Sequence, residues 1–216
     1  MLNDLRRETI PAVANLVHPR VAIGLGVSHV PLVEGLRAHV YDKPVPAMRR
    51  YLDGVYEDPS NAAEWPLVIA ALGPLMLKLA AERTAEAVPY NVTPEHTRAA
   101  RAALGPDKLL AVEQKVCLQT DATAARGLAR RELHRYMTLT NYRNNWLRLG
   151  FTEADLADGG SDRLVDAMVL WGDPATITRG LRAHLAAGAT QVCIQPLQAE
   201  GDVEARDRTL TALADV

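Results

Sequence analysis

The segment LVIAALGPLMLKLA, residues 67–80, is the clearest indication of the fold because it contains a complete strand-to-helix unit. Its first part, residues 67–72, is an uninterrupted apolar run, which is typical of a strand buried on both faces of a sheet. Gly73-Pro74 follows, and proline costs no hydrogen bond at the first position of a helix. After Pro74 the apolar residues recur at helical spacing, so residues 74–84 are predicted to form a helix with one apolar face. Units of this kind build parallel sheets that are covered by helices.

The same alternation of short apolar runs and longer amphipathic runs continues along the chain. Strands are expected at residues 20–25, 67–72, 86–91, 109–118 and 191–195. Helices are expected at residues 44–55, 74–84, 94–104, 122–136, 174–187 and 203–213, with several short helices over residues 140–171. Thr93-Pro94 and Asp173-Pro174 repeat the pattern of a capping residue followed by proline. The pattern therefore predicts a single α/β domain over residues 1–216, with about five parallel strands.

The composition is typical of a soluble globular protein. The chain has 216 residues, of which 48% are hydrophobic and 23% charged, and its formal net charge is −2. A chain without a basic excess is not expected to bind nucleic acid. The two cysteines, Cys117 and Cys193, are too few for a disulfide framework. Residues 1–14 lack the apolar segment of a signal peptide and no apolar run is long enough to span a membrane, so we expect a cytoplasmic protein without a membrane partner.

Two strand ends are candidates for ligand binding, since ligands of parallel α/β folds gather beyond the carboxyl ends of the strands. The first is GLGVSH, residues 24–29, whose glycines would let a flat ligand approach the backbone. His29 replaces the third glycine of a dinucleotide fingerprint, so that interpretation is weak, and His29 is also explained as an ordinary loop or core histidine. The second is Gly73, where the first turn of the helix offers free N–H groups to an anion or simply starts a helix. The histidines form no HxxxH or HExxH pair, so no metal site is expected.

A third stretch, NYRNNWLRLG at residues 141–150, concentrates amides, arginines and aromatic residues. Arg130, Arg131, His134 and Arg135 precede it. Such a segment could bind a phosphate or a polyanionic tail. It is also explained as a solvated helix face with Tyr142 and Trp146 packed beneath it, and the sequence leaves both interpretations open.

Taken together, these segments resemble the luciferase-like monooxygenase superfamily, and specifically its branch of oxidoreductases that depend on the deazaflavin coenzyme F420. The resemblance covers nearly the whole chain from about residue 21 onward. The stretches that resemble the family are GLGVSHVPLVEGL (residues 24–36), YDKPVPAMRRYLD (41–53), ALGPLMLKLAAERTAEAVPYNVTPEHT (71–97), NYRNNWLRLGFTEADLADGGSDRLVDA (141–167) and AGATQVCIQPL (187–197).

The resemblance implies an eight-stranded α/β barrel that binds F420, or alternatively FMN, at the carboxyl ends of its strands. It also implies that backbone amides at the turn of Ala71, Leu72 and Gly73 hold the phosphate of the coenzyme. Ser28 and His29 would lie near the ring, and the reaction would be hydride transfer between the coenzyme and a small organic substrate, with His29 as the catalytic residue. The residues expected to bind the coenzyme are Gly26, Ser28, Ala71, Leu72, Gly73, Pro74 and Leu75.

The chain departs from the pattern of this family at its start. Members have three strand–helix units before the GLGVSH strand, whereas about twenty residues precede it here, and Thr9–Val17 resembles the tail of the third helix. We therefore expect a partial (β/α)8 barrel. Two alternatives stay open: a non-catalytic paralogue that binds a flavin or acts as an assembly partner, and an FMN-dependent monooxygenase. Because a partial barrel exposes two sheet edges, a homodimer is expected.

Overall fold

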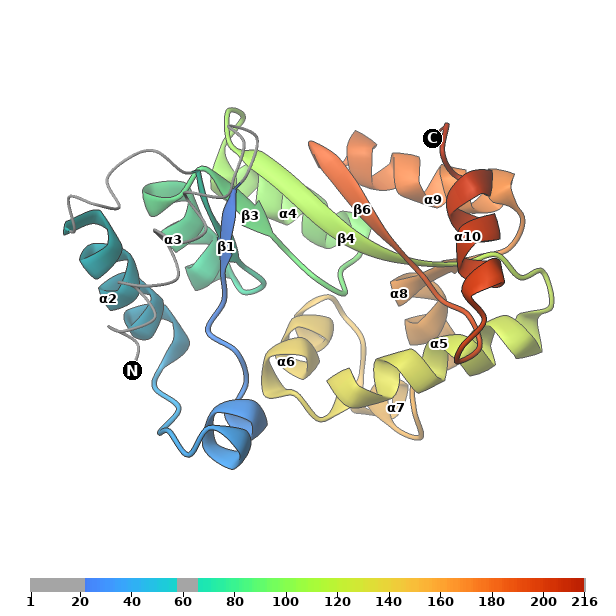
Figure 1. Ribbon diagram of the computed structural model, residues 1–216, viewed down its shortest axis with the longest axis horizontal. Helices are drawn as coiled ribbons and strands as arrows, with labels where there is room; N and C mark the ends of the chain where they lie inside the picture. Colours follow the sequence, from blue (N-terminus) through green and yellow to red (C-terminus); the bar gives the residue numbers. More distant parts are fainter. Residues whose placement is uncertain (1–21, 58–65, 216) are drawn as a thin grey trace.

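The computed structural model describes residues 22–57 and 66–215 (Figure 1). Thr9–Val17, the expected tail of a helix, and the start of the first expected strand lie outside the described residues. The strands are β1 (Ile23–Leu25), β2 (Leu67–Ala70), β3 (Glu86–Val88), β4 (Leu109–Cys117), β5 (Val169–Trp171) and β6 (Gln191–Pro196). The helices are the π-helix η1 (Pro31–Leu36), α2 (Pro44–Glu57), α3 (Pro74–Arg83), α4 (Pro94–Leu104), α5 (Ala122–Met137), α6 (Thr140–Arg148), α7 (Glu153–Leu156), α8 (Asp162–Met168), α9 (Pro174–Ala186) and α10 (Val203–Ala212).

All pairings between these strands are parallel, which confirms the predicted class of sheet. The order is β1-β2-β3-β4, and β6 pairs with β4 over residues 111–116. The strand β4 is long because it has three neighbours: β3 pairs with its first residues and β5 with its last. Lys115 pairs with both β5 and β6, so these two strands flank opposite edges of β4.

The sequence does not predict β5, which lies in the segment for which only short helices are expected. It has just three residues between the end of α8 and Gly172, too few for a recognisable period. Its register is fixed by pairing with Lys115–Cys117 of β4. A tertiary contact, rather than local sequence, therefore makes this segment a strand.

Prolines start the helices that the sequence marked most clearly. Gly73, Thr93 and Asp173 are the N-caps of α3, α4 and α9, and in each helix the next residue is proline. The side chains of Thr93 and Asp173 accept hydrogen bonds from the backbone N–H groups of His96 and Thr176. These caps place the amino termini of α3 and α4 directly after the carboxyl ends of β2 and β3.

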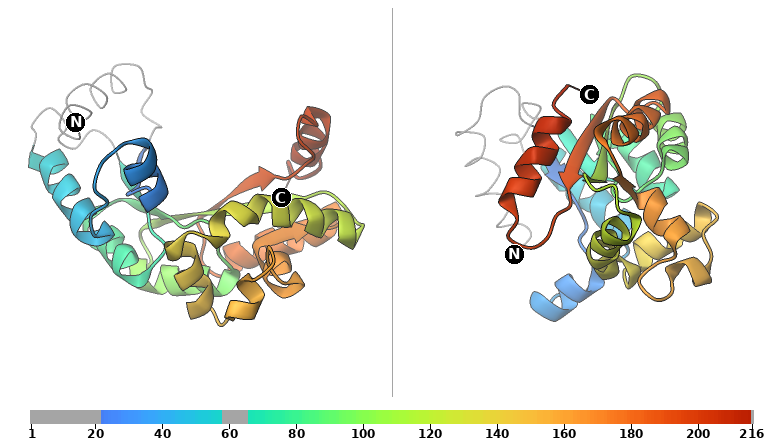
Figure 2. Two further views of the ribbon diagram at one scale, coloured as in Figure 1. Left: turned by 90° about the horizontal axis from the view of Figure 1, so that it is seen from below. Right: turned by 90° about the vertical axis from the view of Figure 1, so that its right-hand side faces the viewer.

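Helices α2, α3, α4 and α9 pack one against the next along the sheet, and an aliphatic core lies between α2–α4 and strands β1–β4. A second core joins α5, α6 and α8 to the far end of β4, with Trp146 fully buried in it. Figure 2 shows that the elements follow an open arc, with α2 near one end and α10 near the other. Among the described strands β1 does not pair with β6, so this sheet is a partial barrel. No helix within the described ranges is long and apolar enough to cross a membrane.

Candidate functional site

Three adjoining hollows lie beyond the carboxyl ends of β1, β2 and β3, and Asn141 of α6 lines all three. The turn hollow, about 460 Å³, borders the first turn of α3 and Arg148. The mouth hollow, about 280 Å³, borders the strand ends, His29 and Tyr90. The side hollow, about 590 Å³, opens between the start of η1 and the loop that joins α5 to α6.

The structure brings every predicted site residue to two of these hollows. Gly26, Ser28, His29, Ala71 and Leu72 line the mouth hollow. Leu72, Gly73, Pro74 and Leu75 line the turn hollow, together with Ser28. Strand ends that are remote in sequence therefore form one continuous surface, as the parallel sheet requires.

The turn between β2 and α3 offers fewer amide donors than its sequence suggests. Ala71 is 1% exposed, and its N–H donates to the carbonyl of Val88 at 3.3 Å. Pro74 has no N–H. The N–H groups of Met76 and Leu77 donate to the carbonyl of Gly73 at 3.1 and 3.0 Å. The donors that remain available to an anion at this turn are therefore those of Gly73 and Leu75.

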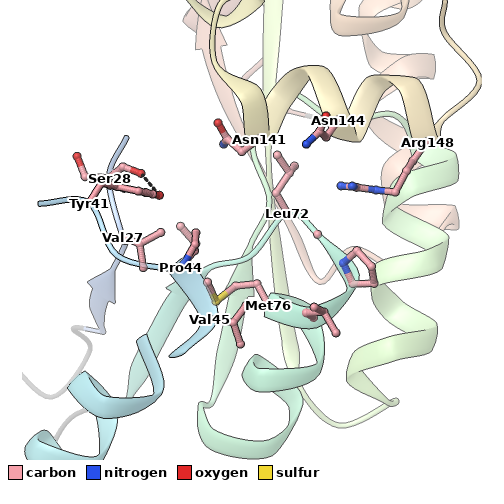
Figure 3. A pocket seen from close by; sticks show the side chains of 14 residues that line it. Val27, Ser28, Tyr41, Pro44, Val45, Leu72, Met76, Asn141, Asn144 and Arg148 are labelled. Carbon is pink, nitrogen blue, oxygen red and sulfur yellow. Dashed lines mark hydrogen bonds between the residues drawn. The ribbon is translucent and has the colours of Figure 1, made fainter. Parts of the chain in front are cut away.

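A face of α6 lies opposite this turn and carries Asn141, Asn144 and Arg148, and Figure 3 shows the Arg148 guanidinium extending toward Leu72. Their spacing of three and four residues places all of them on one side of the helix. A Cβ atom on Gly73 would stand 3.6 Å from Nη2 of Arg148, so the glycine leaves a gap between the turn and the guanidinium. No Asp or Glu lines the turn hollow. A cation, two amides and a helix N-terminus therefore surround a space suited to an anion.

The two sides of α6 have different surroundings, so the structure assigns the two interpretations of residues 141–150 to different side chains and leaves phosphate binding as a prediction. Tyr142, Asn145 and Trp146 are buried in the second core, whereas Asn141, Asn144 and Arg148 face the hollow. The preceding arginines do not reach it. Arg130 pairs with Asp162 and Arg135 pairs with Glu132. Among these arginines, Arg148 is thus the candidate for binding a phosphate, and the sequence indicated it only as one residue of the segment at 141–150.

His29 enters the mouth hollow because the backbone turns sharply after β1. Ser28 has a φ of 61°, and its carbonyl accepts a hydrogen bond from the Tyr41 hydroxyl at 3.2 Å (Figure 3). The ring of His29 lies 5.8 Å from that of Tyr142 and is hydrogen-bonded to the side chain of Asn141. Burial lowers the pKa of His29, and the bond to Asn141 opposes this shift. The imidazole is therefore neutral at pH 7 and able to accept a proton.

His96 contacts the turn between β2 and α3, a role that the sequence did not indicate. Its Nε2 lies 2.8 Å from the carbonyl oxygen of Leu72. Burial lowers the pKa of His96, so the ring is neutral and its Nε2–H donates to this carbonyl. The bond fixes the last residue before Gly73. Among residues 22–57 and 66–215, no group of three or more His, Cys, Asp or Glu side chains is arranged to hold a metal ion.

No family model and no curated protein matches the sequence. Solved structures match the fold. The coenzyme F420-dependent tetrahydromethanopterin reductase of Methanopyrus kandleri superposes with a TM-score of 0.57 at 16% identity, covering 89% of this chain and 72% of its own. An F420-dependent secondary alcohol dehydrogenase, in complex with an F420–acetone adduct, gives 0.65 at 14% identity, over 99% of this chain and 75% of its own.

A third match is the oxygenating constituent of 3,6-diketocamphane monooxygenase from Pseudomonas putida, a type II Baeyer–Villiger monooxygenase in complex with FMN. It gives a TM-score of 0.66 at 13% identity, covering 100% of this chain and 74% of its own. All three proteins belong to the luciferase-like monooxygenase superfamily. The chain therefore has the luciferase-like α/β-barrel fold, and the resemblance seen in the sequence is confirmed at the level of the fold.

Proposed function

We propose that this protein is an oxidoreductase of the luciferase-like superfamily that binds coenzyme F420 and transfers a hydride between it and a small organic substrate. The observation that supports this most directly is the pairing of Arg148 with the first turn of α3 across the turn hollow. An anion site next to an aromatic hollow matches a ligand with a phosphate and a flat ring. The fold is shared with proteins that use F420 and with proteins that use FMN.

The residues present fit such a group. Gly73 leaves a gap that a side chain would fill, and Gly26 lines the mouth hollow without a side chain. Gly73, Leu75 and Arg148 would hold the phosphate. Gly26, Ser28, Leu72 and Tyr142 would border the ring in the mouth hollow.

When bound, the deazaflavin supplies a carbon that accepts or releases a hydride. For an alcohol substrate, the C–H bond would break with loss of a hydride to the coenzyme, the hydroxyl proton would pass to a ring nitrogen of His29, and a C=O double bond would form in the product. The neutral imidazole suits this task, and Asn141 orients it. The side hollow, which His29 also lines, offers a path for the substrate.

The test is a fluorescence titration of the protein with oxidised F420 and, separately, with FMN. We expect saturable binding of F420 and weaker binding of FMN. Tighter binding of FMN would replace the proposal by that of an FMN-dependent monooxygenase. A folded protein that binds neither would overturn it and leave the non-catalytic assembly partner.

We also propose that the chain forms a homodimer. Within the described residues β1 hydrogen-bonds only to β2, and β6 only to β4, so each has one open edge. Open edges of parallel sheets readily pair with another chain. Light scattering after size exclusion tests this: a dimer mass is expected, and a stable monomer at micromolar concentration contradicts it.

A further inference from the structure

A buried ion pair, Lys115 with Glu113, lies beside the ring of Tyr90. Lys115 and Glu113 are two residues apart on β4, so they lie on the same face of the strand. The Lys115 side chain is 0% exposed and the Glu113 side chain 9% exposed. The Lys115 ammonium donates to Glu113 Oε1 at 3.0 Å and to Asn91 Oδ1 at 2.8 Å. It also lies 3.9 Å from the centre of the Tyr90 ring. All three ammonium protons thus have a partner, one of them the face of an aromatic ring.

This pair is poorly explained by stability alone. Removing two charges from water costs free energy that their attraction often does not repay, and apolar residues of similar volume usually serve as well. Burial raises the pKa of Glu113 and lowers that of Lys115, which reflects this cost. A pair of this kind is better suited to fixing a geometry than to strengthening a core.

The geometry that it fixes is that of the chain immediately after β3. Asn91 has a φ of 54°, in the left-handed region. Its N–H donates to Glu113 Oε2 at 3.3 Å, its side-chain oxygen accepts from Lys115, and its carbonyl accepts from Trp146 Nε1 at 3.1 Å. Three anchors therefore hold one residue in an unusual conformation, and the residue before it, Tyr90, is directed into the mouth hollow.

Tyr90 itself is oriented at both ends. Its ring lies against the ammonium, and its hydroxyl donates to Gln195 Oε1 at 2.6 Å while accepting from the Tyr136 hydroxyl at 3.1 Å. The ring of Tyr142 completes the wall, 6.3 Å away in an edge-on arrangement. A phenol ring held in this way presents a fixed surface to a flat ligand, with the Tyr90 hydroxyl at the edge of that surface.

We propose that Tyr90 is a ligand-contacting residue of the mouth hollow and that Lys115 with Glu113 is the positioning pair that fixes its ring. The proposal rests on the proposed function for the identity of the ligand, F420 or FMN. The positioning of Tyr90 by the pair is a property of the protein without ligand and is tested without one.

The first measurement uses protein labelled with 3-fluorotyrosine, in which the Tyr90 signal is assigned by its loss in Tyr90→Phe. In the double variant Glu113→Gln/Lys115→Met the charges are removed together, and the glutamine can still accept from the Asn91 N–H. We expect this signal to shift or broaden while the protein stays folded. An unchanged Tyr90 signal in the folded double variant overturns the positioning role.

The second measurement is a cycle of ligand affinities, with F420 and FMN as probes. We expect Tyr90→Leu and the double variant each to weaken binding about tenfold. In the triple variant the pair should add little to the loss caused by Tyr90→Leu, because it acts through that ring. Additive losses would mean that the pair supports the fold in general, and unchanged affinity in Tyr90→Leu would remove Tyr90 from the site.

The matched control is Gln114→Leu/His184→Leu. Gln114 lies on β4 between the two charged residues, and its side chain bonds to Met168 and His184 instead of facing Tyr90. We expect this variant to lower the melting temperature without changing ligand affinity. If wild-type protein binds neither probe, the proposed function fails, and the fluorine spectra still decide whether the pair positions Tyr90.

Discussion

Nη2 of Arg148, at the end of α6, lies 3.6 Å from the point where a Cβ on Gly73 would stand, at the start of α3. The end of α6 and the start of α3 therefore face each other across a gap, which stays open because Gly73 has no side chain. The gap is lined by a cation and by a helix N-terminus, and by no carboxylate. The proposed function depends on an anion binding at this place.

Filling the gap should block the ligand while leaving the fold intact. Gly73 has φ −87° and ψ 160°, a conformation that any residue adopts, so Gly73→Val introduces no backbone strain. We expect an unchanged melting temperature and an affinity for F420 reduced about tenfold or more, because the new methyl groups occupy the space of the phosphate. Gly35→Ala is the control, since a Cβ there meets nothing within 4 Å. Equal affinities for the Gly73→Val variant and wild type would move the anion site elsewhere.

Removing the positive charge should weaken binding in a manner that depends on salt. Arg148→Met keeps the aliphatic stem and loses the guanidinium, so the affinity for F420 should fall about tenfold at low ionic strength. The difference from wild type should shrink as salt is added. Arg179→Met removes the same charge from α9, where the side chain bonds only to Thr176 among the described contacts, and it should bind normally. The comparison is made by isothermal titration at two salt concentrations.

Loss of the imidazole should affect the chemical step more than binding. In His29→Ala the hydride-transfer rate should fall by about 10²-fold or more, whereas F420 affinity should change little. Because burial lowers the pKa of His29, wild-type activity in the direction that needs a proton acceptor should be constant at neutral pH and fall in acid. Stopped-flow measurement of single-turnover rates separates the two effects. Equal losses in rate and affinity would make His29 a binding residue only.

The stability of the folded protein should fall in acid because of His184, a buried histidine that lines none of the three hollows. Gln114 uses its amide N–H groups on Lys115 and Met168, so its oxygen accepts from Nε2–H of His184. Burial lowers the pKa of His184 to about 4. Between about pH 6.5 and pH 4, His184 is therefore protonated in the unfolded chain but neutral in the folded chain. This difference lowers the free energy of unfolding by about 3 kcal/mol as the pH falls through that range.

Chemical denaturation at pH 7 and at pH 4 measures this loss. His184→Gln keeps a donor for Gln114 and does not titrate, so its stability should fall less than that of wild type between the two pH values. His134→Gln, at an exposed position on α5, should behave as wild type. An identical acid loss in wild type and His184→Gln would assign the effect to other groups, of which buried His96 is the next to test.

The amino-acid sequence predicts the parallel α/β class, the order of the strand–helix units and most helix starts. These features depend on short segments of sequence. A short apolar run such as Leu67–Ala70 favours a buried strand, and a capping residue before proline favours the start of a helix. The strand-end rule then placed Gly26, His29 and Gly73 at one edge of the sheet, because parallel strands bring their carboxyl ends together.

Which residues face one another across that edge depends on the three-dimensional packing. The strand β5 exists because β4 offers it an edge, and the segment at residues 141–150 is core on one side and site on the other because α6 lies between a hollow and Trp146. The approach of Arg148 to Gly73 and the contact of Lys115 with Tyr90 join residues far apart in the chain. Such contacts depend on how the helices pack on the sheet, and no local pattern in a sequence encodes that packing.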